Sequence, residues 1–115
     1  MALSEFEIKK IEKAAEAFLA VRRPAPSIRD KWDIGWRLEQ QSVYIFETRP
    51  LWQDPSQYQD LEVAKATYVQ SQRVWNIYWQ RQDLKWHRYE PDSQVKTIEQ
   101  VFDVINQDEL GCFFG

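Results

Sequence analysis

The sequence predicts an α+β fold in the order helix, five-stranded and largely antiparallel meander sheet, helix. Two observations predict it: an amphipathic helical pattern near each end of the chain, and between them stretches that alternate apolar and polar residues. A third is the length of 115 residues, which suits one domain built around one hydrophobic core. We therefore expect residues 1–115 to form a single domain, with both helices packed on the same face of the sheet.

The first helix is expected to begin after Ser4 and to end near Arg22. Ser4 and Glu7 have the spacing of a capping box, in which each side chain accepts a hydrogen bond from the other residue's backbone N–H. Apolar residues then recur at helical spacing, namely Ile8, Ile11, Ala15, Phe18 and Leu19. Pro24 and Pro26 cannot continue the helix, so it ends before them.

Residues 32–49 predict two strands joined by a turn at Gln40-Gln41, because apolar and polar residues alternate in the first of them. A two-residue turn sets the register. It would place Leu38 opposite Val43, Trp36 opposite Ile45, Ile34 opposite Glu47 and Trp32 opposite Arg49. The charged end of this apolar face favours an ion pair of Glu47 with Arg49.

The next segment, Leu51 to Asp60, is expected to be a loop because it holds Pro55 and several polar residues. Leu51 and Trp52 should tuck back onto the body of the domain. A third strand is expected from Val63 to Val69, followed by a turn centred on Ser71-Gln72. The alternative is a helix over residues 62–70.

The most informative stretch runs from Val74 to Tyr89, and it holds three of the six tryptophans and the single histidine. Two strands turning at Gln82-Asp83 would separate it into two faces. The apolar face would carry Trp75, Ile77, Trp79, Leu84 and Trp86, with Ala64, Ala66 and Tyr68 of the third strand. The polar face would carry Asn76, Tyr78, Gln80, Lys85, His87 and Tyr89, with Lys65 and Thr67.

After these strands, Pro91, Asp92 and Ser93 predict a break with Ser93 as the N-cap of a second helix. Its apolar residues are Val95, Ile98, Val101, Phe102 and Ile105, and it should end near Gln107. The apolar tail, residues 110–115, is expected to be docked on the domain.

Composition narrows the functional classes. The formal net charge of −3 argues against a binder of duplex nucleic acid, which needs a basic surface. There is no apolar run of about 18 residues, so no membrane partner is expected. The lone Cys112 excludes an internal disulfide and a cysteine-based zinc site, and it favours the cytoplasm. With three glycines the chain shows no glycine-rich phosphate loop, and we expect no cofactor.

The polar face is the candidate site for binding. With the turn at Gln82-Asp83, Tyr78 would lie directly opposite His87 on adjacent strands. Tyrosines beside lysines and a histidine could stack bases of single-stranded nucleic acid and hold phosphates, or hold a small anion. The same side chains could instead pack against a second subunit or another protein. The candidate residues are Lys65, Asn76, Tyr78, Lys85, His87 and Tyr89.

Catalytic use has less support in the sequence. A small metal-dependent hydrolase or nuclease would use Glu47 and Lys65, and an Mg²⁺ site would need Glu47, Asp83 and Asp108. His87 would need a partner to orient it as a base, and spacing places neither Asp83 nor Glu90 for that role. We therefore assign no catalytic residue and no metal ligand.

Several motifs together carry a resemblance to a known family. They are E-x-R-P at Glu47–Pro50, A-K at Ala64-Lys65, W-x-x-Y-W-x-R-x-D-x-K-W-H-x-Y at Trp75–Tyr89, and D-x-x-G-C-F at Asp108–Phe113. The chain resembles the bacterial family called domain of unknown function 3024 over nearly its whole length. The resemblance implies a bacterial domain and assigns no mechanism. The leading expectation is a non-enzymatic binding or interaction domain that forms a homodimer or binds a protein or small ligand.

Overall fold

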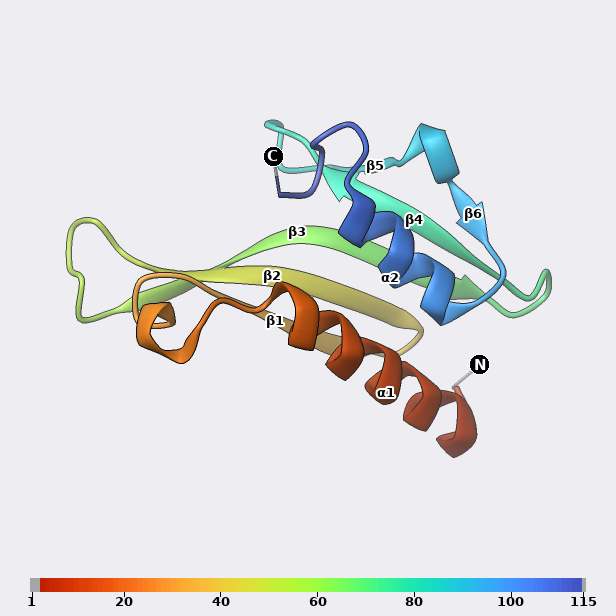
Figure 1. The fold of residues 1–115 in the computed structure, drawn as a ribbon. Coiled ribbons are helices and arrows are strands. Elements are labelled where there is room, and N and C mark those ends of the chain that lie inside the picture. The colour runs from red at the N-terminus through yellow and green to blue at the C-terminus, as the bar shows by residue number, and fades with distance from the viewer. Residues whose placement is uncertain (1–2, 115) are drawn as a thin grey trace.

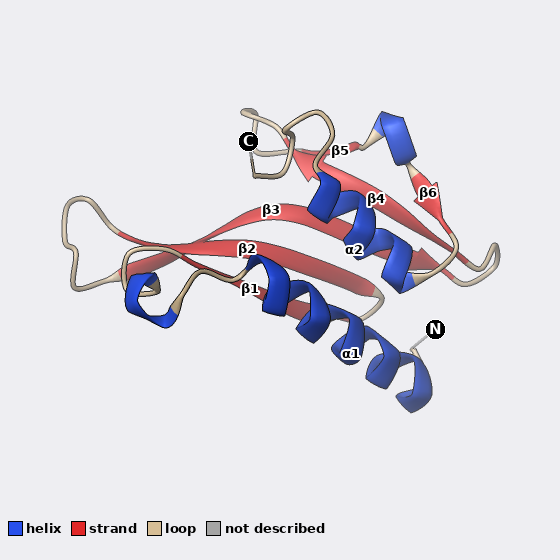
Figure 2. Cartoon of the chain, in the orientation of Figure 1, coloured by secondary structure: helices blue, strands red, loops and turns tan. Residues whose placement is uncertain are grey.

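The computed structural model describes residues 3–114 and shows two helices on one side of an antiparallel sheet (Figure 1). Five strands pair in chain order, and a short sixth strand also pairs with the fourth. Both helices lie against the same sheet face, and the other face is not covered by any described element (Figure 2). The predicted α+β class and the order helix, strands, helix are confirmed, with one strand more than expected.

Helix α1 spans Glu5–Arg22, as predicted. Ser4 is its N-cap, and the capping box with Glu7 is present in both directions, each bond being 3.1 Å long. The helix turns its apolar stripe to the sheet, which buries Ile11, Ala15 and Phe18. A short 3-10 helix, η1 (Pro26–Ile28), then leads into the sheet.

Strands β1 (Asp33–Glu39) and β2 (Ser42–Pro50) form the first hairpin in the predicted register. Leu38 pairs with Val43, Trp36 with Ile45 and Ile34 with Glu47. The tight turn is made possible by Gln40, whose φ of 54° lies in the left-handed region that such turns use. At the far end the guanidinium of Arg49 lies 5.9 Å from the ring centroid of Trp32.

Strand β3 (Tyr58–Val69) is longer than predicted, because it begins inside the segment expected to be a loop. Its first residues pair with the end of β2, up to Pro50 opposite Tyr58, so the loop shrinks to residues 51–57. Backbone pairing satisfies the polar groups that the loop would have left to water. A register shift between Ile45 and Phe46 lets the β2–β3 pair continue as an arm. Trp52 at the tip of this arm is 86% exposed, so the prediction that it tucks back is wrong.

Strand β4 (Val74–Gln80) follows β3 in the predicted register, with Val69 opposite Val74 and Lys65 opposite Tyr78. The helical alternative for residues 62–70 is therefore wrong. Strand β5 (Trp86–Arg88) pairs with β4, but the register differs by one residue from the predicted one. The short helix η2 (Glu90–Asp92) then leads to β6 (Gln94–Val95), which also pairs with β4.

Helix α2 spans Ile98–Gln107 and ends where predicted, but its N-cap is Thr97 and not Ser93. Thr97 forms a capping box with Gln100, which satisfies two backbone N–H groups at once. The sequence Gln94–Val95 joins the sheet instead, where Val95 pairs with Trp75. Of the C-terminal tail, Phe113 is docked and 5% exposed, whereas Leu110 is 64% exposed; Gly115 lies outside the described residues.

The hydrophobic core lies between the helices and the inner sheet face. Its sheet residues are Ile34, Val43, Ile45, Ala64, Ala66, Trp75 and Ile77, and its helix residues include Phe18, Ile98, Val101, Phe102 and Ile105. The small side chains of Ala64 and Ala66 in β3 leave room for larger neighbours. No helix within residues 3–114 combines the length and the apolar content needed to cross a bilayer.

Candidate functional site

The uncovered face of the sheet, called here the outer face, carries an alternating row of cations and aromatic rings. One residue comes from each of the five meander strands, and each is paired in register with the next. In order across the sheet the row is Arg37, Tyr44, Lys65, Tyr78 and Arg88, and we call it the central row. Neighbouring strands lie about 4.8 Å apart, so the row spans roughly 19 Å.

Each cation of the central row lies beside a ring. The Arg37 guanidinium carbon is 4.3 Å from the Tyr44 ring centroid, and that of Arg88 is 5.8 Å from the Tyr78 centroid. Between them, the Lys65 ammonium is 5.7 Å from Tyr44 and 5.5 Å from Tyr78. Contacts of this kind contribute about 0.5–1 kcal/mol each at exposed sites. The two tyrosine rings also stand between the three positive charges of the row and keep them apart.

A third ring joins the centre of the row. Trp86 lies on the outer face, with its ring centroid 5.9 Å from the Lys65 ammonium and 6.2 Å from the Tyr44 centroid. Lys65 is therefore surrounded by three aromatic rings. The rings are half-buried against each other and against the long side chains beside them.

Carboxylates are distributed unevenly along the central row. Arg37 pairs with Glu39 at 2.8 Å and with Glu62 at 3.3 Å. Burial lowers the pKa of Arg37, but its contacts with these two carboxylates outweigh burial and raise the pKa overall. Within residues 3–114, no ion pair involves Lys65 or Arg88. Lys65 at the centre of the row and Arg88 at one end are thus positive charges without a carboxylate partner among these residues.

A second row of neutral polar side chains runs beside the central row. It consists of Ser42, Thr67, Asn76 and Gln94, which are paired in register across β2, β3, β4 and β6. The hydroxyls of Ser42 and Thr67 are 2.8 Å apart, and the Gln94 amide donates to Asn76 Oδ1 at 3.0 Å. Arg88 also donates to Asn76 Oδ1, at 3.4 Å. This polar row places hydrogen-bonding groups directly beside the cations.

The structure brings together half of the residues that the sequence singled out. Lys65, Asn76 and Tyr78 lie on the outer face as predicted. Lys85 lies in the β4–β5 loop and is exposed. His87 pairs with Trp79, which puts its side chain on the helix-covered face, and Tyr89 is 2% exposed in the core.

The β4–β5 loop explains this error. The prediction assumed a hairpin loop of two residues, whereas the observed loop has three. A hydrogen bond of 2.8 Å from the Leu84 N–H to the Arg81 carbonyl closes its turn. Leu84 has a φ of 62°, and this combination of a type I turn with a left-handed residue is a common three-residue hairpin loop. A shift of one residue moves every following side chain to the opposite face. Trp86 and Arg88 therefore take the places assigned to Lys85 and His87, opposite Gln80 and Tyr78.

Besides Arg88, two residues of the central row, Arg37 and Tyr44, were not among the candidates. The sequence indicates Arg37 and Tyr44 indirectly, because the correctly predicted register of the first hairpin sets them opposite each other. Continuing the polar face from β3 onto that hairpin would have found both residues.

His87 belongs to a different environment at the end of β5. Its Nε2 lies 3.0 Å from Asp83 Oδ2, so Asp83 does orient His87, contrary to the expectation from spacing. The Lys85 backbone N–H and then His87 lower the pKa of Asp83. His87 also lines a cavity of about 310 Å³ with Arg81, Tyr89 and Cys112, among others. Burial and then Asp108 raise the pKa of the Cys112 thiol, which keeps it protonated and unreactive at neutral pH.

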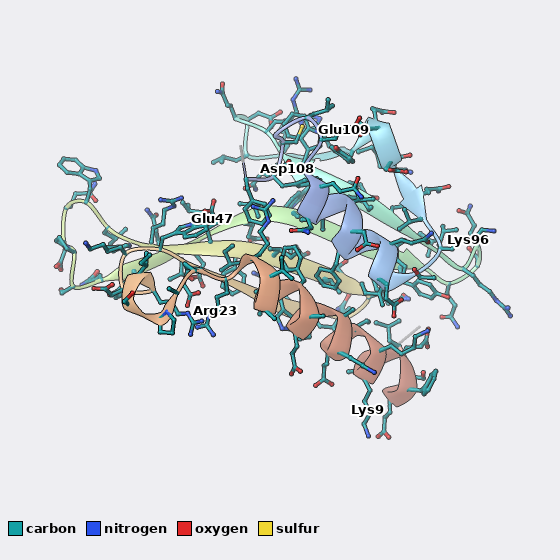
Figure 3. The ribbon with its side chains drawn as sticks, in the orientation of Figure 1. Lys9, Arg23, Glu47, Lys96, Asp108 and Glu109 are labelled. Carbon is teal, nitrogen blue, oxygen red and sulfur yellow. The ribbon has the colours of Figure 1, made fainter. Side chains whose placement is uncertain are left out.

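The groups needed for a metal-dependent hydrolase are not assembled. Glu47 lies on the helix-covered face, where it accepts hydrogen bonds from Trp32 and, at 2.9 Å, from Arg49, whereas Lys65 lies on the outer face. Figure 3 shows Glu47 beside the sheet and Asp108 at the end of α2. Within the described residues, no group of three or more His, Cys, Asp or Glu side chains could hold a metal ion. The interpretation of Glu47, Asp83 and Asp108 as an Mg²⁺ site is therefore wrong.

Fold and surface together define a small α+β domain whose antiparallel sheet is covered by helices on one face and carries rings and cations on the other. The chain belongs to the family described as "Domain of unknown function (DUF3024)", which it matches over residues 3–115. No curated protein and no solved structure matches it.

Proposed function

We propose that this protein is a non-enzymatic binding domain whose outer sheet face holds an anionic ligand or partner. The observation that carries the proposal is the central row, in which two of three cations, Lys65 and Arg88, have no carboxylate partner in the described part of the chain. A phosphate or carboxylate brought to this face would supply the missing counter-charge. The rings hold the cations in place before the ligand arrives, which reduces the entropy lost on binding.

Physical arguments separate this proposal from self-association through the same face. A face-to-face pair of identical copies would bring together two sets of Lys65 and Arg88, which have no carboxylate partner among the described residues, and like charges in an interface are costly. The Tyr, Trp and Arg side chains of the row would otherwise suit a protein interface, where these residue types are enriched. Self-association through the outer face, which the sequence favoured, stays a prediction. We place the domain in the cytoplasm on the basis of its lone cysteine.

The proposal is tested with inorganic polyphosphate, a polyanion without rings or bases. Calorimetric titration of the wild type should show binding that weakens steeply as salt is added, because the contact is electrostatic. Lys65→Glu should abolish it, since the substitution reverses the charge at the centre of the row.

The matched control is Lys9→Glu, which reverses a charge on the exposed outer surface of α1. It changes the net charge of the chain by the same amount but lies away from the sheet face. Equal loss in both variants would show that net charge, and not the central row, governs binding. Absence of polyphosphate binding to the wild type at low salt would contradict the proposal.

A further inference from the structure

We infer that the anionic partner of the outer face is single-stranded nucleic acid. This inference rests on the proposed function and specifies its ligand. A small anion or an acidic peptide would use the cations alone. The outer face offers, in addition, rings on which bases can stack and hydrogen-bonding side chains that suit the edges of bases.

The rings supply the first argument. Tyr44, Tyr78 and Trp86 lie within one patch around Lys65, with cation-to-centroid distances between 5.5 and 5.9 Å. Surfaces that bind single strands combine aromatic rings, on which bases stack, with cations that follow the phosphates. Because the Arg37 guanidinium already lies 4.3 Å from the Tyr44 centroid, we expect Tyr78 and Trp86 to be the rings on which bases stack.

The cations supply the second argument. Lys65 and Arg88 flank Tyr78 on the two neighbouring strands, so a base stacked on Tyr78 would have a cation on either side for its phosphates. The negative net charge of the chain does not oppose this arrangement, because it is the local surface that meets the ligand.

The polar row supplies the third argument. Asn76 and Gln94 carry amides, and Ser42 and Thr67 carry hydroxyls, beside the cations. Amides and hydroxyls both donate and accept hydrogen bonds, as the edges of unpaired bases require. The outer face of the sheet exposes these groups to an extended single strand of nucleic acid. In a duplex the bases stack on one another, so their faces could not reach the aromatic rings. The outer face therefore fits a single strand better than a duplex.

The experiment compares two ligands of equal charge on the wild-type protein. One is a short oligothymidylate, and the other is the same oligonucleotide with abasic sites in place of the bases. If bases stack on the rings, the oligothymidylate should bind more tightly by about five-fold or more, because stacking on a single aromatic side chain contributes at least that much. The comparison needs no variant and so is independent of folding.

Variants then locate the stacking. Tyr78→Ala should weaken binding of the oligothymidylate more than binding of the abasic strand, because it removes the stacking ring as well as a support of Lys65 and Arg88. Tyr78→Phe should retain the wild-type affinity for both strands because the ring remains. Tyr58→Ala is the matched control, since Tyr58 is 51% exposed on the arm. It should bind both strands as the wild type does.

Each other outcome has a defined meaning. Equal binding of the two strands would overturn the inference and leave the proposed function standing. Tighter binding of polyglutamate than of oligothymidylate at equal charge would also overturn it and indicate an acidic peptide as the partner. Failure of both strands and of inorganic polyphosphate to bind would overturn the inference and the proposed function together.

Discussion

Tyr78 lies opposite Arg88 across the β4–β5 pair, and this single register relationship determines what the outer face presents. With it, the central row ends in a guanidinium 5.8 Å from the Tyr78 centroid, and Tyr89 enters the core. A shift by one residue would bury Arg88 and expose Tyr89. The β4–β5 loop is therefore as important for the proposed binding surface as the side chains of the row.

The first prediction concerns Leu84, which fixes this register with a φ of 62° although it is 76% exposed. Leu84→Gly should stabilise the domain by up to about 1 kcal/mol, because glycine adopts the left-handed conformation without steric cost and little buried area is lost. Urea unfolding measures the change. Leu110→Gly is the control, because Leu110 is also exposed but has no positive φ; stabilisation of that variant as well would contradict the explanation.

The second prediction concerns the close approach of Gly35 to Phe46 on the outer face. A Cβ atom at position 35 would lie 2.7 Å from two atoms of the Phe46 ring, which is closer than side chains pack. Gly35→Ala should therefore cost about 1 kcal/mol or more of unfolding free energy. In a Phe46→Ala background, Gly35→Ala should lower the unfolding free energy very little. An equal cost with and without the ring would show that the clash is not its cause.

The third prediction concerns Asp108, which ends α2 in the left-handed conformation with a φ of 45°. Its carboxylate accepts hydrogen bonds from the backbone N–H groups of Phe113 and Phe114, at 2.9 and 2.8 Å. Asp108→Ala should cost about 2 kcal/mol and should accelerate hydrogen exchange at these two amides. Asp103→Ala, an exposed carboxylate of the same helix, is the control. Unchanged exchange in the Asp108 variant would contradict the tie between helix and tail.

The fourth prediction concerns the pH dependence of stability. Arg23 donates two hydrogen bonds of 2.8 Å to Asp33, and the contact lowers the pKa of Asp33 below its ordinary value of 3.8. A carboxylate whose pKa is lower in the folded state stabilises the fold above its unfolded pKa, and this contribution is lost as the pH falls through the folded value. Asp33→Asn should therefore destabilise the domain near neutral pH, and the difference from wild type should shrink in strong acid. A difference that stays constant with pH would refute the ion pair as its source.

The sequence was sufficient where local rules act alone. The structure confirms the Ser4–Glu7 capping box, the Gln40-Gln41 turn and the turn centred on Ser71-Gln72. The last of these turns is enough to place Lys65 opposite Tyr78.

It failed where two local solutions compete and tertiary pairing decides between them. The β4–β5 stretch can form a loop of two residues or of three. A glycine would have indicated the left-handed position of the three-residue loop, but leucine occupies it as Leu84. Likewise Ser93 and Thr97 are both acceptable N-caps, and the pairing of Val95 with Trp75 favours Thr97. The first part of β3, residues 58–62, was missed because it is stabilised by pairing with the end of β2, which no periodicity records.

The most direct test of the central claim is amide and indole NMR of the wild-type protein during titration with inorganic polyphosphate. We predict that the largest shifts occur at the backbone amides of Lys65, Tyr78 and Arg88 and at the indole N–H of Trp86, while the signals of α1 stay in place. Shifts concentrated on the helices, or around the cavity that holds Cys112, would contradict the account and place the binding surface elsewhere.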